Sequence, residues 1–287
     1  MTRSGTFWPF WGLMQELVQE GRAPRLIVLE NVYGALTSHG GKDFAAISLA
    51  LSSSGYRFGA VVINARLFLP QSRPRVFFIA VRHGERIPVE LIGDGPQMLW
   101  HPAALKAAYA ALTVEARKQW VWWNINAPGT RNTVFLDLIE DTPTAVDWHT
   151  PTETQHILDM MSPGNKAKVA AAIKINRKIV GGVYRRTRPD EKGAKRQRAE
   201  VRFDDMSGCL RTPAGGSSRQ TILVIEGDTI RSRLLSPREA ARLMGLDDSY
   251  RLPNRYNDAY HVAGDGVCVP VVRHLANTML EPILANK

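Results

Sequence analysis

A carboxylate and two arginines are the residues of this sequence best suited to act on a planar polar substrate. Glu30 follows the apolar run Leu26-Ile27-Val28-Leu29, and the carboxyl end of such a strand is where open α/β sheets bind ligands. Arg73 and Arg75 stand two positions apart where another apolar run begins, so both are expected to project to one side and offer forked donors to a carbonyl or phosphate oxygen. Each group also has a structural interpretation: Glu30 as a surface residue that begins a loop, and the arginines as an ion pair at the rim.

The two cysteines offer no obvious nucleophile. Cys209 and Cys268 are far apart and belong to no Cys-x-x-Cys or His-partnered pattern, so neither a disulfide framework nor a zinc site is predicted. Neither surrounding motif supplies a group that would stabilise a thiolate. We interpret both as structural residues.

The elements around these residues alternate between helix and strand, as in an α/β fold. Helices are expected at 13–20 and 44–51, and strands at 26–29, 60–64 and 75–81. The apolar character of 26–29 is typical of a central parallel strand. Towards the end of the chain, a strand is expected at 222–225 and a last helix at 271–280. Between them, Ser236 as N-cap, Pro237, Glu239 and Gly245 mark the start and stop of a short helix.

The middle of the chain has a different composition. Trp100, Trp120, Trp122, Trp123 and Trp148 fall among several Pro and Gly residues, and we interpret them as the core of a second, smaller domain, with stacking on bases as the alternative.

A basic segment follows the tryptophans. Residues 166–202 contain thirteen Lys and Arg and three acidic residues, so their balance equals the +10 net charge of the whole chain. Concentrated positive charge fits a contact with a polyanion, and a solvated basic loop is the alternative.

Composition excludes some classes of protein. With 287 residues and 44% hydrophobic content, the chain is long enough to bury one large core or two modest ones. No apolar run approaches the roughly 20 residues of a membrane-spanning helix, and the N-terminus has no secretory signal pattern. A cytoplasmic protein is expected.

Four ordered motifs resemble the later motif series of DNA (cytosine-5) methyltransferases. They are Glu30-Asn31-Val32; Asn64-Ala65 with Gln71-x-Arg73-x-Arg75; the run from Arg233 through Ser236-Pro237-Arg238-Glu239 to Gly245; and Gly264-Asp265-Gly266-Val267-Cys268-Val269-Pro270. The resemblance spans the chain except for residues 100–205, which occupy the place of that family's variable target recognition domain.

The resemblance implies a role for each matching residue. Glu30 would hydrogen-bond a flipped-out cytosine and protonate its N3, and Arg75, supported by Arg73, would hold the cytosine O2. The implied cofactor is S-adenosyl-L-methionine, in contact with Phe7, within Ser4-Gly5-Thr6-Phe7-Trp8, and with the loop of Asp265 and Gly266. The family more often has Asn at the position of Asp265. The implied partner is double-stranded DNA, contacted by Arg185, Arg186, Arg188, Lys195, Arg196 and Arg198.

Three motifs of the family are expected before Ser4 and do not occur in these residues: the Phe-x-Gly-x-Gly cofactor loop, the acidic ribose-binding residue and the Pro-Cys nucleophile. The resemblance therefore implies a second chain, or upstream sequence, that carries them. Alternatives are an inactive DNA-binding remnant and an RNA cytosine methyltransferase, the latter disfavoured by the long basic recognition region.

The expected architecture is a partial methyltransferase sheet of Rossmann-like α/β type with an inserted smaller domain. Its expected parts are residues 1–95 as the rear half of the catalytic domain, 96–210 as the target recognition domain, and 211–287 as a segment that returns to the catalytic domain.

Overall fold

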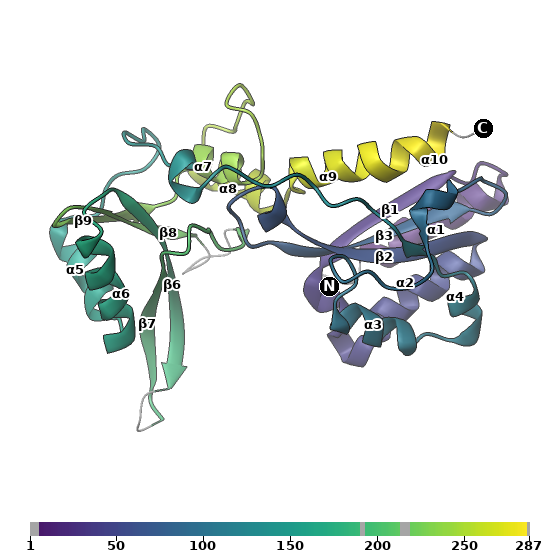
Figure 1. Cartoon of the computed structure of the whole chain (residues 1–287), viewed down its shortest axis with the longest axis horizontal. Coiled ribbons are helices and arrows are strands. Elements are labelled where there is room, and N and C mark those ends of the chain that lie inside the picture. Colours follow the sequence, from purple (N-terminus) through teal and green to yellow (C-terminus); the bar gives the residue numbers. More distant parts are fainter. Residues whose placement is uncertain (1–5, 190–192, 213–218, 286–287) are drawn as a thin grey trace. The chain divides into compact units, whose positions relative to one another are not determined.

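The computed structural model describes residues 6–189, 193–212 and 219–285 (Figure 1). The chain forms two compact units, which we call unit 1 (residues 1–64, 74–129 and 272–287) and unit 2 (65–73 and 130–271). This division does not coincide with the expected boundaries at 95 and 210. Residues 96–129 belong to unit 1, and residues 211–271 belong to unit 2.

Unit 1 is built on a sheet of three strands, β1 (Leu26–Val32), β2 (Tyr56–Asn64) and β3 (Pro74–Arg82), in the order β1-β3-β2. Both pairings are antiparallel, which corrects the expectation of a parallel neighbour for residues 26–29. The reason is topological. The crossover through helix α2 (Lys42–Ser53) sets β2 parallel to β1, but β3 returns after the short 65–73 connection and pairs between them.

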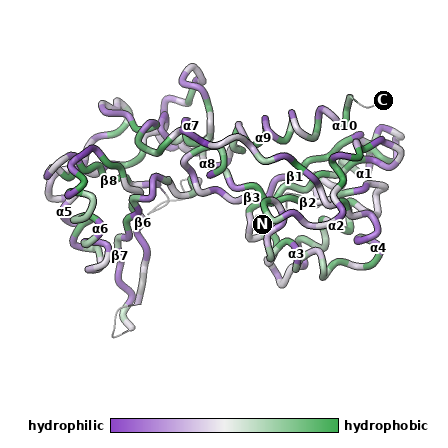
Figure 2. Tube along the Cα trace, viewed as in Figure 1, coloured by the Kyte–Doolittle hydropathy of each residue, from purple (hydrophilic) through white to green (hydrophobic). Residues whose placement is uncertain are grey.

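Helices cover this sheet. The core on one face joins α1 (Phe7–Gln19), α2, α3 (Ala103–Ala110) and α4 (Val114–Lys118) to inward residues of all three strands. On the other side of the sheet, Figure 1 shows the C-terminal helix α10 (Glu281–Ala285), which continues α9 (Val269–Leu275) through the π-helical turn Ala276–Leu280. Figure 2 shows the three strands as predominantly hydrophobic.

The tryptophans of the middle segment are mostly core residues, as expected, but their core is that of unit 1. Trp100 and Trp123 are buried, and Trp120 packs against Phe44 and Phe58. The short strands β4 (Ile92–Gly93) and β5 (Trp122–Trp123) pair here. A Cβ at Gly59 of β2 would lie 2.0 Å from the Val121 carbonyl oxygen, so only glycine permits this close approach.

Unit 2 is built on an antiparallel sheet in the order β7-β6-β8-β9. Its strands are β6 (Ile179–Pro189), β7 (Lys195–Arg202), β8 (Thr221–Glu226) and β9 (Thr229–Leu234). Helices α5 (Pro151–Asp159) and α6 (Pro163–Lys174) share a hydrophobic core with this sheet. Strand β8 was expected to belong to the catalytic domain, and its pairing with β6 places it in unit 2 instead.

The helices α7 (Pro237–Leu243) and α8 (Tyr256–Asp265) complete unit 2. The predicted capping of α7 is confirmed: the Glu239 amide donates to Ser236 Oγ (3.1 Å), and the Ser236 amide donates to Glu239 Oε2 (2.7 Å). Gly245 follows with a left-handed φ of 77°, and a Cβ there would lie 2.4 Å from Pro270 Cδ. Throughout the described ranges, every helix is too short or too polar to cross a bilayer.

Candidate functional site

Glu30 and Arg75 form an ion pair on neighbouring strands of unit 1. Arg75 Nε lies 2.8 Å from Glu30 Oε1, and the two side chains are 15% and 27% exposed. The register explains the contact: Arg75 lies opposite Val32, two residues from Glu30 on the same face, so the pair meets diagonally across the ladder. Arg75 Nη1 also donates to the Pro74 carbonyl (3.0 Å). The arrangement presents a carboxylate that is partly open to solvent beside a fixed cationic donor.

Arg73 does not share this site, although it was expected to support Arg75. Strand β3 begins at Pro74, so Arg73 precedes the pleat and the expected alternation does not apply to it. Its side chain is buried within unit 2. There Nη1 donates to the Leu210 carbonyl (3.2 Å), and Nη2 donates to the carbonyls of Gly264 (3.1 Å) and Gly266 (2.8 Å). By these contacts Arg73 is a positioning residue that fixes two loops.

Gln71 acts in the same way. Its buried side chain donates from Nε2 to the Leu243 carbonyl (2.6 Å) at the end of α7 and accepts from the Leu210 amide (3.4 Å). The motif Gln71-x-Arg73-x-Arg75 therefore performs two different tasks. Its first two members hold unit 2 together, and its third pairs with Glu30 in unit 1.

The expected cofactor contacts divide between the two units. Phe7, at the start of α1, is half-buried, and its ring stacks on Trp11 with the centroids 5.7 Å apart. Asp265, in unit 2, pairs with His261 (3.0 Å) and accepts a hydrogen bond from Thr212 Oγ1. Ser4 and Gly5 lie outside the described residues.

Taken separately, each of these groups has the chemistry to contact part of an adenosyl ligand. Phe7 offers an aromatic face, and the loop of Asp265 and Gly266 offers backbone groups held in place by Arg73. Gly266 itself is needed for packing, since a Cβ there would lie 2.9 Å from the Val262 carbonyl oxygen. Further contacts with such a ligand must come from other residues.

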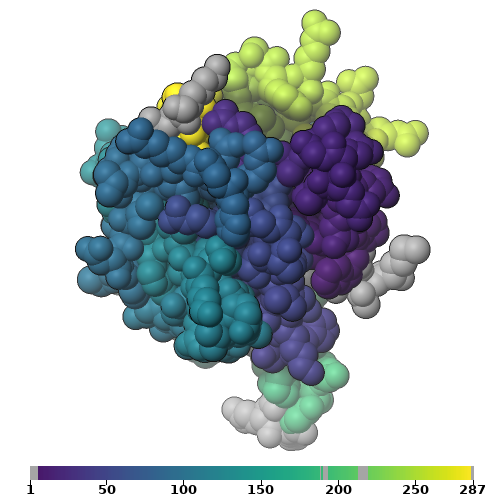
Figure 3. Space-filling view, turned by 90° about the vertical axis from the view of Figure 1, so that its right-hand side faces the viewer, coloured from purple at the N-terminus to yellow at the C-terminus, as the bar shows by residue number. Residues whose placement is uncertain are grey.

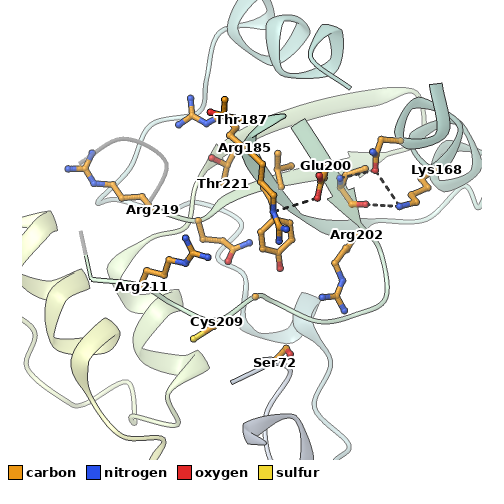
Figure 4. A pocket seen from close by; sticks show the side chains of 17 residues that line it. Ser72, Lys168, Arg185, Thr187, Glu200, Arg202, Cys209, Arg211, Arg219 and Thr221 are labelled. Carbon is orange, nitrogen blue, oxygen red and sulfur yellow. Dashed lines mark hydrogen bonds and ion pairs between the residues drawn. The ribbon is translucent and has the colours of Figure 1, made fainter. Parts of the chain in front are cut away.

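Unit 2 contains a cationic pocket of about 700 Å³ (Figure 4). Its walls come from α6, β6, β7 and the loops on either side of the undescribed residues 213–218. Among the described residues that line it, Glu200 is the one acid, and it lies 3.6 Å from Arg186. The cationic side chains that line it are Lys168, Arg185, Arg186, Arg202, Arg211 and Arg219.

Two of the six residues expected to contact DNA line this pocket, Arg185 and Arg186. Lys195 and Arg196 are exposed on β7, opposite Pro189 and Arg188 in the ladder. The side chain of Arg188 lies outside the described part of the chain. Arg198 is half-buried and lines a separate, smaller cavity beside Glu200.

Sequence analysis missed four lining cations as site residues. Lys168 and Arg202 were counted in the basic segment, whereas Arg211 and Arg219 lie beyond it. Fold topology brings these cations together: Lys168 lies on α6 and Arg202 on β7, and the pairing of β8 with β6 places Arg219, two residues before β8, at the same pocket. No local pattern of residues signals that pairing.

The cysteines fit a structural role. Cys268 is buried, and this burial raises the pKa of its thiol to about 11. Cys209 is half-buried, and its Sγ lies 3.6 Å from Arg73 Nη1 and 3.4 Å from the Leu210 carbonyl oxygen.

Known proteins match this chain in three kinds of comparison. A family model described as C-5 cytosine-specific DNA methylase matches residues 2–281. The chain is 36% identical to the orphan methyltransferase M.SPBetaI of Bacillus phage SPbeta over 67 residues. These aligned residues make up 23% of this chain and 15% of that protein. It is 42% identical to the type II methyltransferase M.NlaX of Neisseria lactamica over 57 residues, and this alignment covers 20% of this chain and 18% of that protein. The alignments thus span less than a fifth of these relatives.

Solved structures show the same fold at low identity. The Entamoeba histolytica methyltransferase EhMeth matches with a TM-score of 0.53 and 12% identity, over 96% of this chain and 68% of that one. A DNMT2 variant from Spodoptera frugiperda matches with a TM-score of 0.52 and 14% identity, over 96% of this chain and 71% of that one.

Proposed function

Because the chain belongs to the C-5 cytosine-specific DNA methylase family, we propose that it supplies the substrate-binding carboxylate and the DNA-recognition unit of a DNA (cytosine-5-)-methyltransferase. The observation that carries this proposal is the pair of Glu30 and Arg75, which sets an acid and a cationic donor side by side on adjacent strands. In this proposal the enzyme modifies cytosine within a specific DNA sequence, as part of a restriction-modification system or of phage or host DNA modification.

The two side chains act on neighbouring polar groups along one edge of a cytosine. Glu30 hydrogen-bonds N3 and the exocyclic amine of a base extruded from the duplex, and it places a proton on N3 as a thiolate adds to C6. Arg75 donates to O2, where negative charge builds up.

S-adenosyl-L-methionine, when bound, supplies the methyl group for C5. In this chain Phe7 would provide an aromatic face for the ligand, and the backbone at Asp265 and Gly266 would provide polar contacts. Arg73 would act indirectly by holding that loop.

The thiolate must come from residues other than the two cysteines here. Burial keeps Cys268 protonated at neutral pH, and the sequence at Cys209, Gly208-Cys209-Leu210, is not a Pro-Cys motif. We assign the nucleophile to a polypeptide segment with Pro-Cys and Phe-x-Gly-x-Gly motifs, on a partner chain or in a longer form of this one. We call it the front segment.

DNA binding is assigned to unit 2. Lysines and arginines from several parts of the chain converge on one pocket, whose described lining includes a single acid. The exposed Lys195 and Arg196 extend the positive charge along β7. Such a surface neutralises several phosphates at once, so binding should weaken steeply as salt rises.

The catalytic proposal is tested by methyl transfer from labelled S-adenosyl-L-methionine to DNA, with the chain and the front segment combined. Glu30→Gln should reduce transfer by roughly 10²–10⁴-fold, as expected for loss of a general acid. Glu85→Gln is the matched control, because Glu85 is an ion-paired carboxylate of the same unit, held by Arg25 and Arg82. Equal loss in both variants would contradict a special role for Glu30, and DNA binding without transfer in the wild-type pair would favour the inactive DNA-binding protein.

The DNA-binding proposal is tested by the slope of log affinity against log salt. Replacing Arg185, Arg186 and Arg188 together with Ala should flatten the slope by about 3, close to one per lost phosphate contact. The exposed Arg22 of unit 1, paired only with Glu20 in the described structure, provides a control substitution that leaves the slope unchanged. A slope unchanged in the triple variant would show that β6 does not contact DNA.

A further inference from the structure

The cationic pocket of unit 2 contains a buried polar group that contacts with phosphates leave unused. Gln220 lines the pocket and is only 7% exposed. Its Nε2 is buried and, within the described residues, has no hydrogen-bond partner. An unpaired buried donor destabilises the fold, and a ligand that enters the pocket can supply the missing acceptor.

The backbone of Gln220 is held on both sides. Its N–H donates to the Tyr260 hydroxyl oxygen (3.1 Å), and its carbonyl accepts from the Leu235 N–H (2.8 Å). A Cβ at Gly182 would lie 3.0 Å from Gln220 Nε2, so this glycine leaves the amide the room that it occupies. The amide is therefore presented from a fixed position, as a recognition group must be.

An aromatic ring lines the same pocket. Tyr184 lies on β6, and the guanidinium carbon of Arg186 is 5.8 Å from its ring centroid. A Cβ at Gly208 would lie 2.3 Å from the Tyr184 hydroxyl oxygen, so only glycine admits the ring in this position. Aromatic rings and arginine guanidinium groups are the side chains on which proteins stack unpaired bases.

Cations surround these two side chains. Figure 4 shows Arg211 and Arg202 on opposite sides of the pocket. The pocket volume of about 700 Å³ lies within the range of small-ligand sites, roughly 300–1,000 Å³. Ring, amide and cations together offer one contact for each part of a nucleotide: the face of the base, the edge of the base and the phosphate.

The burial of Gln220 decides between a paired and an unpaired base. Direct readout of a paired base requires a side chain that projects into a groove of the duplex, and the major groove is about 12 Å wide and 8.5 Å deep. Gln220 lies inside a hollow instead, so the base must come to the amide. A nucleotide turned out of the duplex can do that.

We infer that this pocket binds one unpaired nucleotide of the DNA, with the base stacked on Tyr184, its edge read by Gln220 and its phosphate held by the arginines. The inference rests on the proposed function for DNA as the source of the nucleotide. It makes Gln220 a residue that determines sequence specificity.

This nucleotide is a different one from the target cytosine. The described residues that line the pocket all belong to unit 2, whereas Glu30 and Arg75 belong to unit 1. Figure 3 shows part of the surface of unit 1, with α1 in dark purple. The enzyme would therefore bind two nucleotides outside the duplex, one for methylation and one for recognition.

The test measures the affinity of the whole chain for a duplex with one unpaired nucleotide, carrying each of the four bases in turn, and for the fully paired duplex. Because unpairing costs free energy, the wild type should bind the unpaired forms more tightly and should discriminate among the bases. Tyr184→Leu should weaken binding of the unpaired forms by roughly 10-fold. Tyr184→Phe keeps the ring and should retain the preference.

Replacement of Gln220 separates recognition from phosphate binding. Gln220→Met should lower the affinity for the preferred base by roughly 10-fold and make the four bases nearly equal, with the salt dependence unchanged. Gln155→Met is the matched control, because Gln155 is an exposed glutamine of the same unit that donates to Asp159. It should leave both the affinity and the discrimination unchanged.

Stability of the free chain distinguishes recognition from a structural role. Gln220→Met removes a donor without a partner, so the urea midpoint of unit 2 should not fall. A lower midpoint, with affinity reduced equally for every DNA, would give Gln220 a structural role and overturn the inference.

The remaining outcomes separate this inference from the proposed function. Equal affinity of the wild type for paired and unpaired DNA, or a preference that survives in Tyr184→Leu and Gln220→Met, would overturn the pocket and leave the proposed function standing. A preference that depends on both residues, without methyl transfer by the chain and the front segment, would support the pocket and contradict the proposed function. Free nucleoside monophosphates that bind through Tyr184 and Gln220 in a chain that does not bind DNA would overturn DNA as the source of the nucleotide.

Discussion

Replacement of Arg73 with methionine should destabilise unit 2 selectively. Arg73 is 4% exposed, and its guanidinium donates to the Leu210, Gly264 and Gly266 carbonyls at 3.2, 3.1 and 2.8 Å. Methionine keeps much of the apolar stem but removes this donor from three carbonyls; the contact at Gly266 is partly buried, and the Leu210 carbonyl also accepts from Cys209 Sγ. Each uncompensated group costs about 1–3 kcal/mol, offset in part because a buried cation no longer needs desolvation. We expect a loss of about 3–5 kcal/mol in the free energy of unfolding of unit 2.

Hydrogen exchange by mass spectrometry measures this loss locally, which matters because two compact units need not unfold in a single step. Peptides that cover 207–212 and 261–268 should exchange much faster in Arg73→Met, whereas peptides from β2 and α2 in unit 1 should not change. Arg251→Met, at an exposed arginine, is the control and should stay within about 0.5 kcal/mol of the wild type. A loss below about 1 kcal/mol with unchanged exchange in both loops would refute the assignment of Arg73 as a positioning residue.

Three further outcomes follow from buried groups. Arg233 and Glu239 are fully buried partners 2.6 Å apart, so Glu239→Gln should lower the free energy of unfolding in urea by about 3–5 kcal/mol. Replacing both partners, Arg233→Met with Glu239→Leu, should recover most of that loss, and additive losses would contradict this. Burial raises the Cys268 pKa to about 11, so iodoacetamide at pH 8 should label Cys209 first and Cys268 only after unfolding, as mass spectrometry of the peptides can show; rapid labelling of native Cys268 would be the opposite result. Burial also lowers the pKa of His101 to about 4. The free energy of unfolding should therefore be highest above the ordinary histidine pKa and should fall as the pH drops from there towards 4. His101→Gln should flatten that part of the pH profile in unfolding experiments.

The elements of unit 1 could largely be predicted from sequence because their signals are local. The apolar runs that became β1, β2 and β3 and the periodic residues of α2 lie close to the expected bounds, whereas α1 begins at Phe7, six residues before the expected start. The capping of α7 by Ser236 and Glu239 could also be predicted, since its hydrogen bonds join residues three apart. The order in which the strands pair could not be predicted, because β3 pairs between two strands whose apolar patterns look alike.

The candidate site was only partly predictable for the same reason. Glu30 and Arg75 belong to motifs, and their diagonal contact follows once the register is known. Arg73 differs from Arg75 only in standing before the strand begins, which no pattern of residue types reveals. Arg211 and Arg219 reach the pocket through the pairing of β8 with β6, a contact between distant parts of the chain.

The central claim is that this chain contributes Glu30 and the recognition unit to a cytosine methyltransferase, while the attacking thiolate belongs to the front segment. Covalent trapping tests it most directly, using DNA in which the target cytosine carries fluorine at C5. After thiolate addition and methyl transfer, C5 has no proton to lose, so the enzyme sulfur stays bound to C6. The account predicts a DNA adduct on the front segment, absent with Glu30→Gln, and none on this chain. An adduct on Cys209 or Cys268, formed by the 287-residue chain alone, would contradict it.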